Sequence, residues 1–221
     1  MLAAVDKRLQ SDVDSTTAQL SKFGLLKSAV SDSQVAANAL TSLPSSATAS
    51  DLTSAIGNFF NTYDAAITAA KAASAATGST AASQSATRVT SDLTRALSSN
   101  PATQDAMKKL GLSVQTDGTI VQDAQKFAAA LSSDPAGVRS AMATIGKQVD
   151  AVTTKELATN GRVTTELSAL NQHSVTLAAQ QKAMAALEAA LASLQGTSST
   201  ASSSSTTGMG LAAYQSNSMG F

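Results

Sequence analysis

Apolar side chains recur every three or four residues along most of this chain, which is the period of an amphipathic helix. The first stripe comprises Leu9, Val13, Thr16, Leu20 and Phe23. Pro, the strongest helix breaker, occurs only 3 times in 221 residues, whereas Ala, the best helix former, is abundant. Aromatic residues make up 3% of the chain, so the seams between helices must consist of Leu, Val and small residues. These features predict a mainly α fold, an elongated antiparallel helical bundle or coiled coil.

A seven-residue repeat marks the C-terminal third of the chain. Its members are Val163, Leu170, Leu177, Met184 and Leu191. The partner position of the heptad is apolar at Leu167 and polar afterwards, so half of the seam is polar. Such a seam favours a bundle or a contact between several chains over a tight two-stranded coiled coil. We therefore expect an oligomer or partner interface at these five residues, together with Leu20 and Phe23.

One short segment departs from the helical period. Leu112 and Val114 alternate with polar residues, Asp117-Gly118 follows, and Ile120 comes next. An Asp-Gly pair between alternating apolar residues is a strong signal for a β-hairpin. The sequence therefore predicts one small hairpin near residues 112–121. We expect it to pack on helices, because a two-stranded sheet is only marginally stable alone.

Turn-forming residues divide the rest of the chain. The pattern predicts a long N-terminal helix over residues 1–43 and a linker over residues 44–50, because Pro44 disfavours helix at the residue before it. Ser50 or Asp51 is expected to cap the next helix.

Residues 51–195 are then predicted to form a helical bundle that contains the hairpin. A long C-terminal helix is predicted from about Ile145 to Leu194, with Asn160-Gly161 as the point at which it can break. Residues 196–221 are rich in Ser and Thr, cannot bury enough apolar surface to order themselves, and are predicted to be disordered.

Charge and composition exclude several classes of protein. Lys+Arg and Asp+Glu both number 15, and no basic cluster exists, which excludes a typical nucleic-acid or polybasic membrane-surface binder. No uncharged apolar run is long enough to span a membrane. With no Cys and one His, disulfides and Cys-based or multi-histidine metal sites are excluded. Asp6, Lys7 and Arg8 occupy the place of a signal peptide's apolar segment, so we expect any export to proceed without a cleaved signal.

Few residues are candidates for chemistry. His173 lies between polar residues of the predicted C-terminal helix and is interpreted as a solvated side chain. Glu156 and Glu166 roughly share a helix face, but an acid–base pair needs one carboxylate in an apolar pocket. Both lie among Thr and Lys and are interpreted as solvated. Asp117-Gly118 lacks the alternating carboxylates of a calcium loop. We therefore predict no catalytic residue, cofactor or metal, and no enzyme.

Three blocks of the sequence resemble the flagellar filament cap protein family, also called flagellar hook-associated protein 2. Gln19–Val30 is similar to that family's first long helix, and Phe59–Ile67 to the helix in which its chain returns from its central domains. Leu110–Ile120 and the following helix, which ends in Leu131–Val138, are similar to its hairpin, next helix and Pro-containing turn. The closing helix, Asn160–Leu194, also fits, and the likeness covers about residues 10–195.

The resemblance implies the helical leg of a cap protein. The family carries large β-rich domains where this chain has only residues 44–50. By this resemblance the chain is expected to be a structural, extracellular protein of the bacterial flagellum. It would oligomerise with itself at the filament tip and assist the assembly of flagellin. The alternative is a secreted helical binding module, namely an adhesin, an effector or an export accessory, that uses the same leg.

Overall fold

The computed structural model describes the backbone of residues 2–76 and 78–217 and the side chains of residues 4–76 and 78–194. Within this part the chain is mainly helical and contains a two-stranded antiparallel sheet, as the sequence predicts. It divides into two compact units, Met1–Ser11 with Val175–Phe221, and Asp12–Ser174. None of the described helices is both long enough and apolar enough to cross a membrane.

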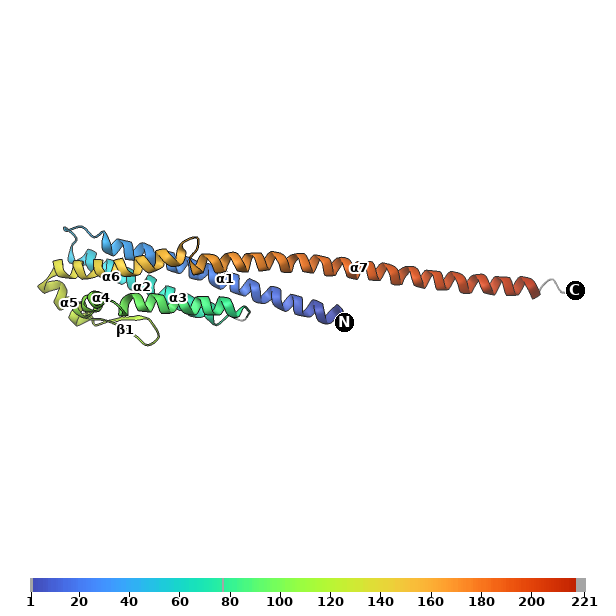
Figure 1. Ribbon diagram of the computed structural model, residues 1–221, viewed down its shortest axis with the longest axis horizontal. Coiled ribbons are helices and arrows are strands. Elements are labelled where there is room, and N and C mark those ends of the chain that lie inside the picture. Colours follow the sequence, from blue (N-terminus) through green and yellow to red (C-terminus); the bar gives the residue numbers. More distant parts are fainter. Residues whose placement is uncertain (1, 77, 218–221) are drawn as a thin grey trace. The chain divides into compact units, whose positions relative to one another are not determined.

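The elements follow one another in a simple order (Figure 1). They are α1 (Leu2–Thr41), α2 (Ala49–Ser74), α3 (Thr80–Ser98), α4 (Pro101–Lys109), β1 (Leu112–Val114), β2 (Ile120–Gln122), α5 (Ala124–Ser133), α6 (Pro135–Leu157) and α7 (Arg162–Asn217). The helix predicted from Ile145 onward is two helices, because Gly161 N–H donates to the Ala158 carbonyl at 2.8 Å in a turn. The backbone of α7 is helical through Asn217. Side chains from residue 195 on lie outside the described residues, and disorder over 196–221 stays a prediction.

The connection between α1 and α2 differs from the prediction in its bounds. The loop covers residues 42–48, and the cap of α2 is Thr48 rather than Ser50 or Asp51. Thr48 Oγ1 accepts the Asp51 N–H at 3.2 Å, and the Asp51 carboxylate accepts the Thr48 N–H at 2.8 Å. This reciprocal capping box satisfies two backbone donors that the helix leaves unpaired, so it fixes the start of α2 at Ala49.

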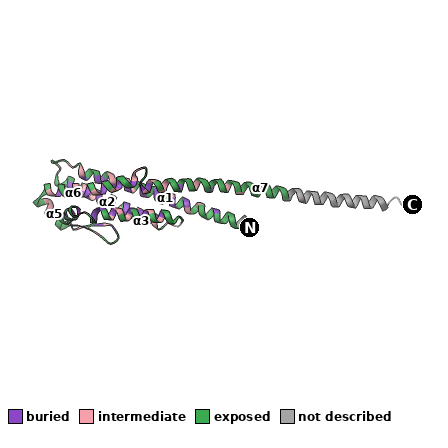
Figure 2. Ribbon diagram, viewed as in Figure 1, coloured by how far each residue is buried: buried purple, intermediate pink, exposed green. Residues whose placement is uncertain are grey.

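The hydrophobic core of the larger unit contains side chains from α1, α2, α3, α6 and α7. Helix α2 packs on α3, and α6 packs on both α3 and α4. Figure 2 shows the buried residues along these helices. The largest fully buried side chains are Tyr63, Phe23, Phe59, Leu26, Leu40, Leu52, Ile56, Ile67, Leu93, Leu97, Leu110 and Met142. The rings of Phe59 and Tyr63 lie 5.9 Å apart, so two of the few aromatic residues meet at one point of this core.

Helices α1 and α6 approach each other closely at Gly146. A Cβ atom at this position would lie 2.5 Å from the Ala37 carbonyl oxygen and 3.0 Å from the Leu40 Cβ. Two hydrogen bonds join the same helices farther along α6, from Gln34 to Thr154 at 2.6 Å and from Asn38 to Asp150 at 2.9 Å. The missing side chain of Gly146 is therefore what allows the two backbones to meet.

The hairpin forms where the sequence predicts it. Strands β1 and β2 pair with Leu112 opposite Gln122 and Val114 opposite Ile120. Gly118 has a φ of 90°, which favours glycine, and a Cβ there would lie 2.9 Å from Thr94 Oγ1 on α3. The hairpin is packed on helices, as a two-stranded sheet requires.

In the smaller unit the start of α1 and the middle of α7 contact each other. Leu9 and Leu177 are both buried there. Gln181 Nε2 donates to Gln10 Oε1 at 3.1 Å. Most other described side chains of this unit are exposed.

Candidate interaction site

The seven residues predicted to form an interface are not all at the surface. Phe23, Val163 and Leu170 belong to the core of the larger unit, and the partly buried Leu20 packs against it. In the smaller unit Leu177 is buried, Met184 is half-buried and Leu191 is 37% exposed. A heptad stripe looks the same whether the same chain or another chain covers it. The first part of the repeat therefore builds this chain's own core, and only Met184 and Leu191 keep exposed surface.

An apolar face on α7 extends this exposed part of the repeat. Leu187, which the sequence analysis did not single out, is 47% exposed. It follows Met184 by three residues and precedes Leu191 by four, so the three side chains share one helix face. We call Met184, Leu187 and Leu191 the α7 ridge. The sequence indicates this face only through Leu187, an apolar residue three positions after Met184 and outside the seven-residue repeat.

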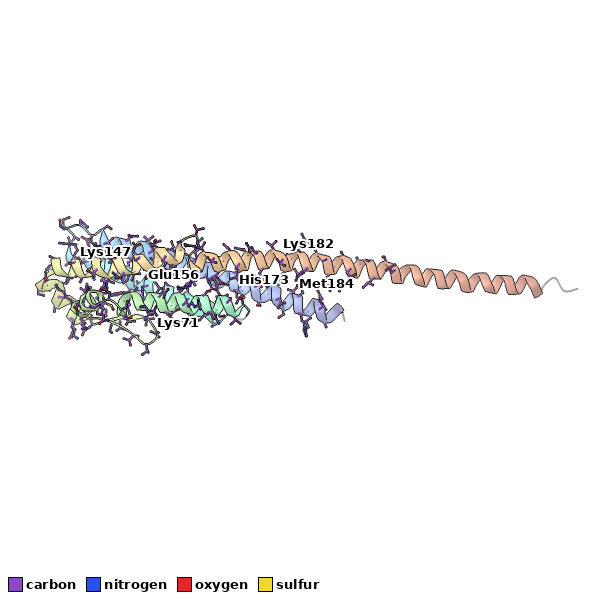
Figure 3. All side chains as sticks on the ribbon, in the orientation of Figure 1. Lys71, Lys147, Glu156, His173, Lys182 and Met184 are labelled. Carbon is purple, nitrogen blue, oxygen red and sulfur yellow. The ribbon has the colours of Figure 1, made fainter. Side chains whose placement is uncertain are left out.

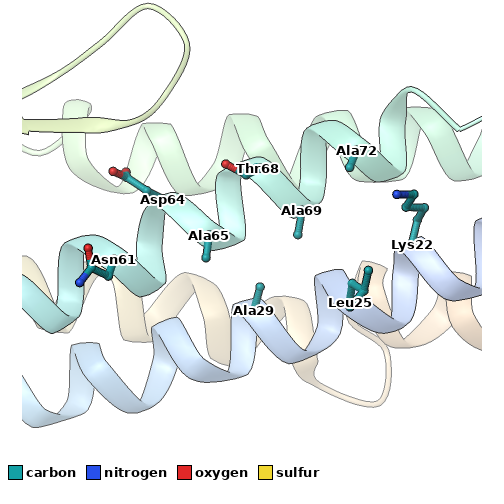
Figure 4. A pocket seen from close by; sticks show the side chains of 9 residues that line it. All are labelled: Lys22, Leu25, Ala29, Asn61, Asp64, Ala65, Thr68, Ala69 and Ala72. Carbon is teal, nitrogen blue, oxygen red and sulfur yellow. The ribbon is translucent and has the colours of Figure 1, made fainter.

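A groove runs between α1 and α2 on the larger unit (Figure 4). We call it the α1–α2 groove. Its volume is about 570 Å³, and its lining comprises Lys22, Leu25, Ala29, Asn61, Asp64, Ala65, Thr68, Ala69 and Ala72. Ala65 and Ala69 point toward Ala29, and Leu25 is 59% exposed. The floor is thus apolar. The space between the two helices stays open because the alanine side chains are too small to fill it.

Charged groups border this groove. Lys22 lies at the end near Ala72, and no carboxylate lies within ion-pair distance of it among the described side chains. Asp64 lies at the other end, where its Oδ1 accepts the Ile120 N–H at 2.9 Å. Burial raises the pKa of the Asp64 carboxyl, and this hydrogen bond opposes the rise.

The hairpin turn carries a second carboxylate near the same helix. Asp117 Oδ2 lies 3.4 Å from Lys71 Nζ of α2. Hydrogen bonds from the Thr119 hydroxyl and backbone N–H, with the charge of Lys71, lower the pKa of Asp117 to about 2. Asp64 and Asp117 therefore hold the hairpin against α2 by a backbone hydrogen bond and an ion pair.

A buried carboxylate cluster lies where α6 ends and α7 begins. Arg162 Nη1 lies 2.8 Å from Glu156 Oε1 and 2.5 Å from Asp92 Oδ2 of α3. Glu156 is only 1% exposed, so its interpretation as a solvated carboxylate was wrong. The tertiary packing of α3 against α6 covers it, and Figure 3 labels its position. The signal that the sequence analysis missed was Arg162, directly after the Asn160-Gly161 turn.

The pKa values of the two carboxyls in this cluster shift in opposite directions. Burial raises the pKa of Glu156, Arg162 opposes the rise, and the charge of Asp92 adds to it. Burial also acts to raise the pKa of Asp92, but the hydrogen bond and charge of Arg162 hold it below its ordinary value. The arrangement joins three helices by charge-assisted hydrogen bonds.

The remaining titratable candidates lie apart. His173 is exposed on α7 (Figure 3). Glu166 is on α7 and accepts a hydrogen bond from Ser85 Oγ at 3.0 Å, so it lies on a different helix from Glu156. Within the described side chains, no three His, Cys, Asp or Glu residues are grouped closely enough to hold a metal ion.

The larger unit is thus a mainly α-helical bundle with a docked β-hairpin and an open groove between α1 and α2. The smaller unit exposes an apolar face of α7. The chain matches no known family model, no curated protein and no solved structure.

Proposed function

We propose that this chain is a non-catalytic structural protein that acts as a flagellar cap-like subunit and assists flagellin assembly through its helices. One observation carries the proposal. The three sequence blocks that resemble the cap family pack together in the larger unit. Phe23 of the first block and Phe59 of the second share one core. Asp64 of the second block binds the Ile120 N–H of the third.

The mechanism would be non-covalent. An incoming flagellin subunit has to bury its own helices, and an exposed apolar helix face offers temporary cover while it does so. The α7 ridge is such a face, with Leu187 47% exposed and Leu191 37% exposed. The protein would act outside the cell, at the filament tip.

A second candidate function is supported by the loop between α1 and α2. By the resemblance, residues 44–50 stand where the cap family carries its central domains, and the loop that contains most of them covers residues 42–48. One hydrogen bond joins this loop to the bundle: Arg139 Nη1 of α6 donates to the Ser45 carbonyl at 3.0 Å. A helical bundle in which only a short loop joins α1 and α2 also suits a secreted helical binding module, such as an adhesin, an effector or an export accessory.

Localisation and deletion separate the two candidates. The cap-like function predicts that the labelled protein lies at filament tips and that deletion of its gene shortens filaments and reduces motility. Full-length filaments and normal swimming in the deletion strain, with label elsewhere on the cell surface, would instead support the binding module. A Leu187→Glu variant, matched with Val175→Glu on another face of α7, tests the ridge in the same assays, since both residues are exposed.

A further inference from the structure

We propose that the α7 ridge of one copy packs into the α1–α2 groove of a second copy, so that the chain associates with itself from ridge to groove. The proposal deepens the proposed function and rests on its premise that helical faces of this chain dock on other helices. It differs from the interface expected at Val163, Leu170 and Leu177, because those side chains are buried within their own chain.

The ridge has the form of an inserting surface. Met184, Leu187 and Leu191 are spaced as i, i+3 and i+7, which aligns them along one face of α7. Leu187 and Leu191 keep much of their surface exposed. Large apolar side chains that are aligned and exposed in this way favour burial against another surface.

The groove has the form of a receiving surface. Its floor of alanines lets the backbone of a third helix come close, and its width is set by two helices that are already packed in the core. Leucine side chains of one helix fit between small residues of others by the ordinary packing of ridges into grooves. Ala65 is exposed at the centre of the floor, so an occupant would contact it directly.

Charge complementarity favours a second copy as the occupant. Lys22 stands at one end of the groove, and Glu188 follows Leu187 directly, on the flank of the ridge. Neither side chain forms an ion pair with another described residue of its own chain. The formal net charge of the chain is zero, so two copies do not repel each other as they approach.

This contact would be heterologous, because the ridge and the groove are different surfaces. Each copy that uses its ridge still offers its groove. A copy whose groove alone is occupied keeps its ridge free, and that free ridge is the one left to contact flagellin. Association of this type continues beyond the dimer, whereas a contact between identical faces stops there.

The test is sedimentation velocity of the purified full-length chain over a range of concentrations at low ionic strength. The wild type should form species larger than a dimer. Leu187→Glu should weaken association at least about tenfold, because it removes one buried leucine. Val175→Glu, at a 71% exposed residue nine positions before Met184 and hence on another face, should leave association unchanged.

The groove has its own matched pair. Ala65→Arg fills the floor from its exposed side and should weaken association to a similar degree, whereas Ala128→Arg, at an exposed position of α5, should not. Lys22→Glu and Glu188→Lys should each weaken association by up to about fivefold, and the double variant should restore it.

Three results would overturn the contact: a monomer at every concentration, equal effects of the Leu187 and Val175 variants, or a charge-swapped double variant as weak as the single ones. A monomer in solution that still labels filament tips would overturn this contact and leave the proposed function standing. Ridge-to-groove association without any label at the filament would support this contact and overturn the proposed function.

Discussion

Replacing Gly146 by Ala tests the closest helix contact in the larger unit. The new Cβ would lie 2.5 Å from the Ala37 carbonyl oxygen, and a backbone atom cannot move aside as a flexible side chain can. Overpacking of this kind costs about 1–3 kcal/mol. The substitution also stabilises the helix itself by about 1 kcal/mol, because Ala is the better helix former. We expect a net loss of up to about 2 kcal/mol.

Gly57→Ala is the matched control. Gly57 lies inside α2, and a Cβ there would meet nothing within 4 Å. This variant therefore receives the helix-propensity gain of about 1 kcal/mol without the clash. The same chemical change thus has opposite signs at the two sites, and the difference between the variants reports the steric effect alone.

Urea unfolding followed by helical circular dichroism measures both variants. The midpoint should fall for Gly146→Ala and rise for Gly57→Ala, with an unchanged dependence on urea concentration. If the two variants were equally stable, α1 and α6 would not be in backbone contact at residue 146, and the packing described for them would be wrong.

Three further predictions address the cap, the hairpin and the buried cluster. Thr48→Ala should destabilise the fold by about 1 kcal/mol through loss of the helix cap, whereas Ser50→Ala should be nearly neutral; thermal melts of both variants would show whether Thr48 is the cap. Asp64→Ala should cost about 1–2 kcal/mol, because it leaves the Ile120 N–H without its acceptor, and faster hydrogen exchange at that amide would report the loss directly. Glu156→Gln should remove a pH dependence: the folded state raises the pKa of this carboxyl, so wild-type stability should fall as pH rises above the ordinary value of 4.5. Urea midpoints between pH 4 and pH 8 should then slope less for Glu156→Gln, and equal slopes would contradict the raised pKa.

Much of the fold could be predicted from local pattern. The β-hairpin was found because Asp117-Gly118 and its alternating neighbours act within ten residues of one another. The start of α2 was misplaced by only a few residues, since several adjacent residues can cap a helix and the local sequence does not decide among them.

The candidate site could be predicted only in part. The heptad repeat predicted an interface, but the pattern could not say that this chain itself covers Val163, Leu170 and Leu177. The α1–α2 groove brings together Lys22 and Ala65, which are far apart in sequence, so no local pattern indicates it. The environment of Glu156 likewise depends on Asp92 and Arg162, which other helices supply.

By itself the sequence determined that this chain is mainly helical, where the hairpin near residues 112–121 lies, and that most of its core side chains are small or aliphatic. These properties follow from backbone propensity and from the periodicity of apolar side chains, which act over a few residues. Only the tertiary structure decided which stripe is core and which is surface, and which carboxylate is buried. Burial and pairing depend on residues that are distant along the chain, and folding alone brings them together.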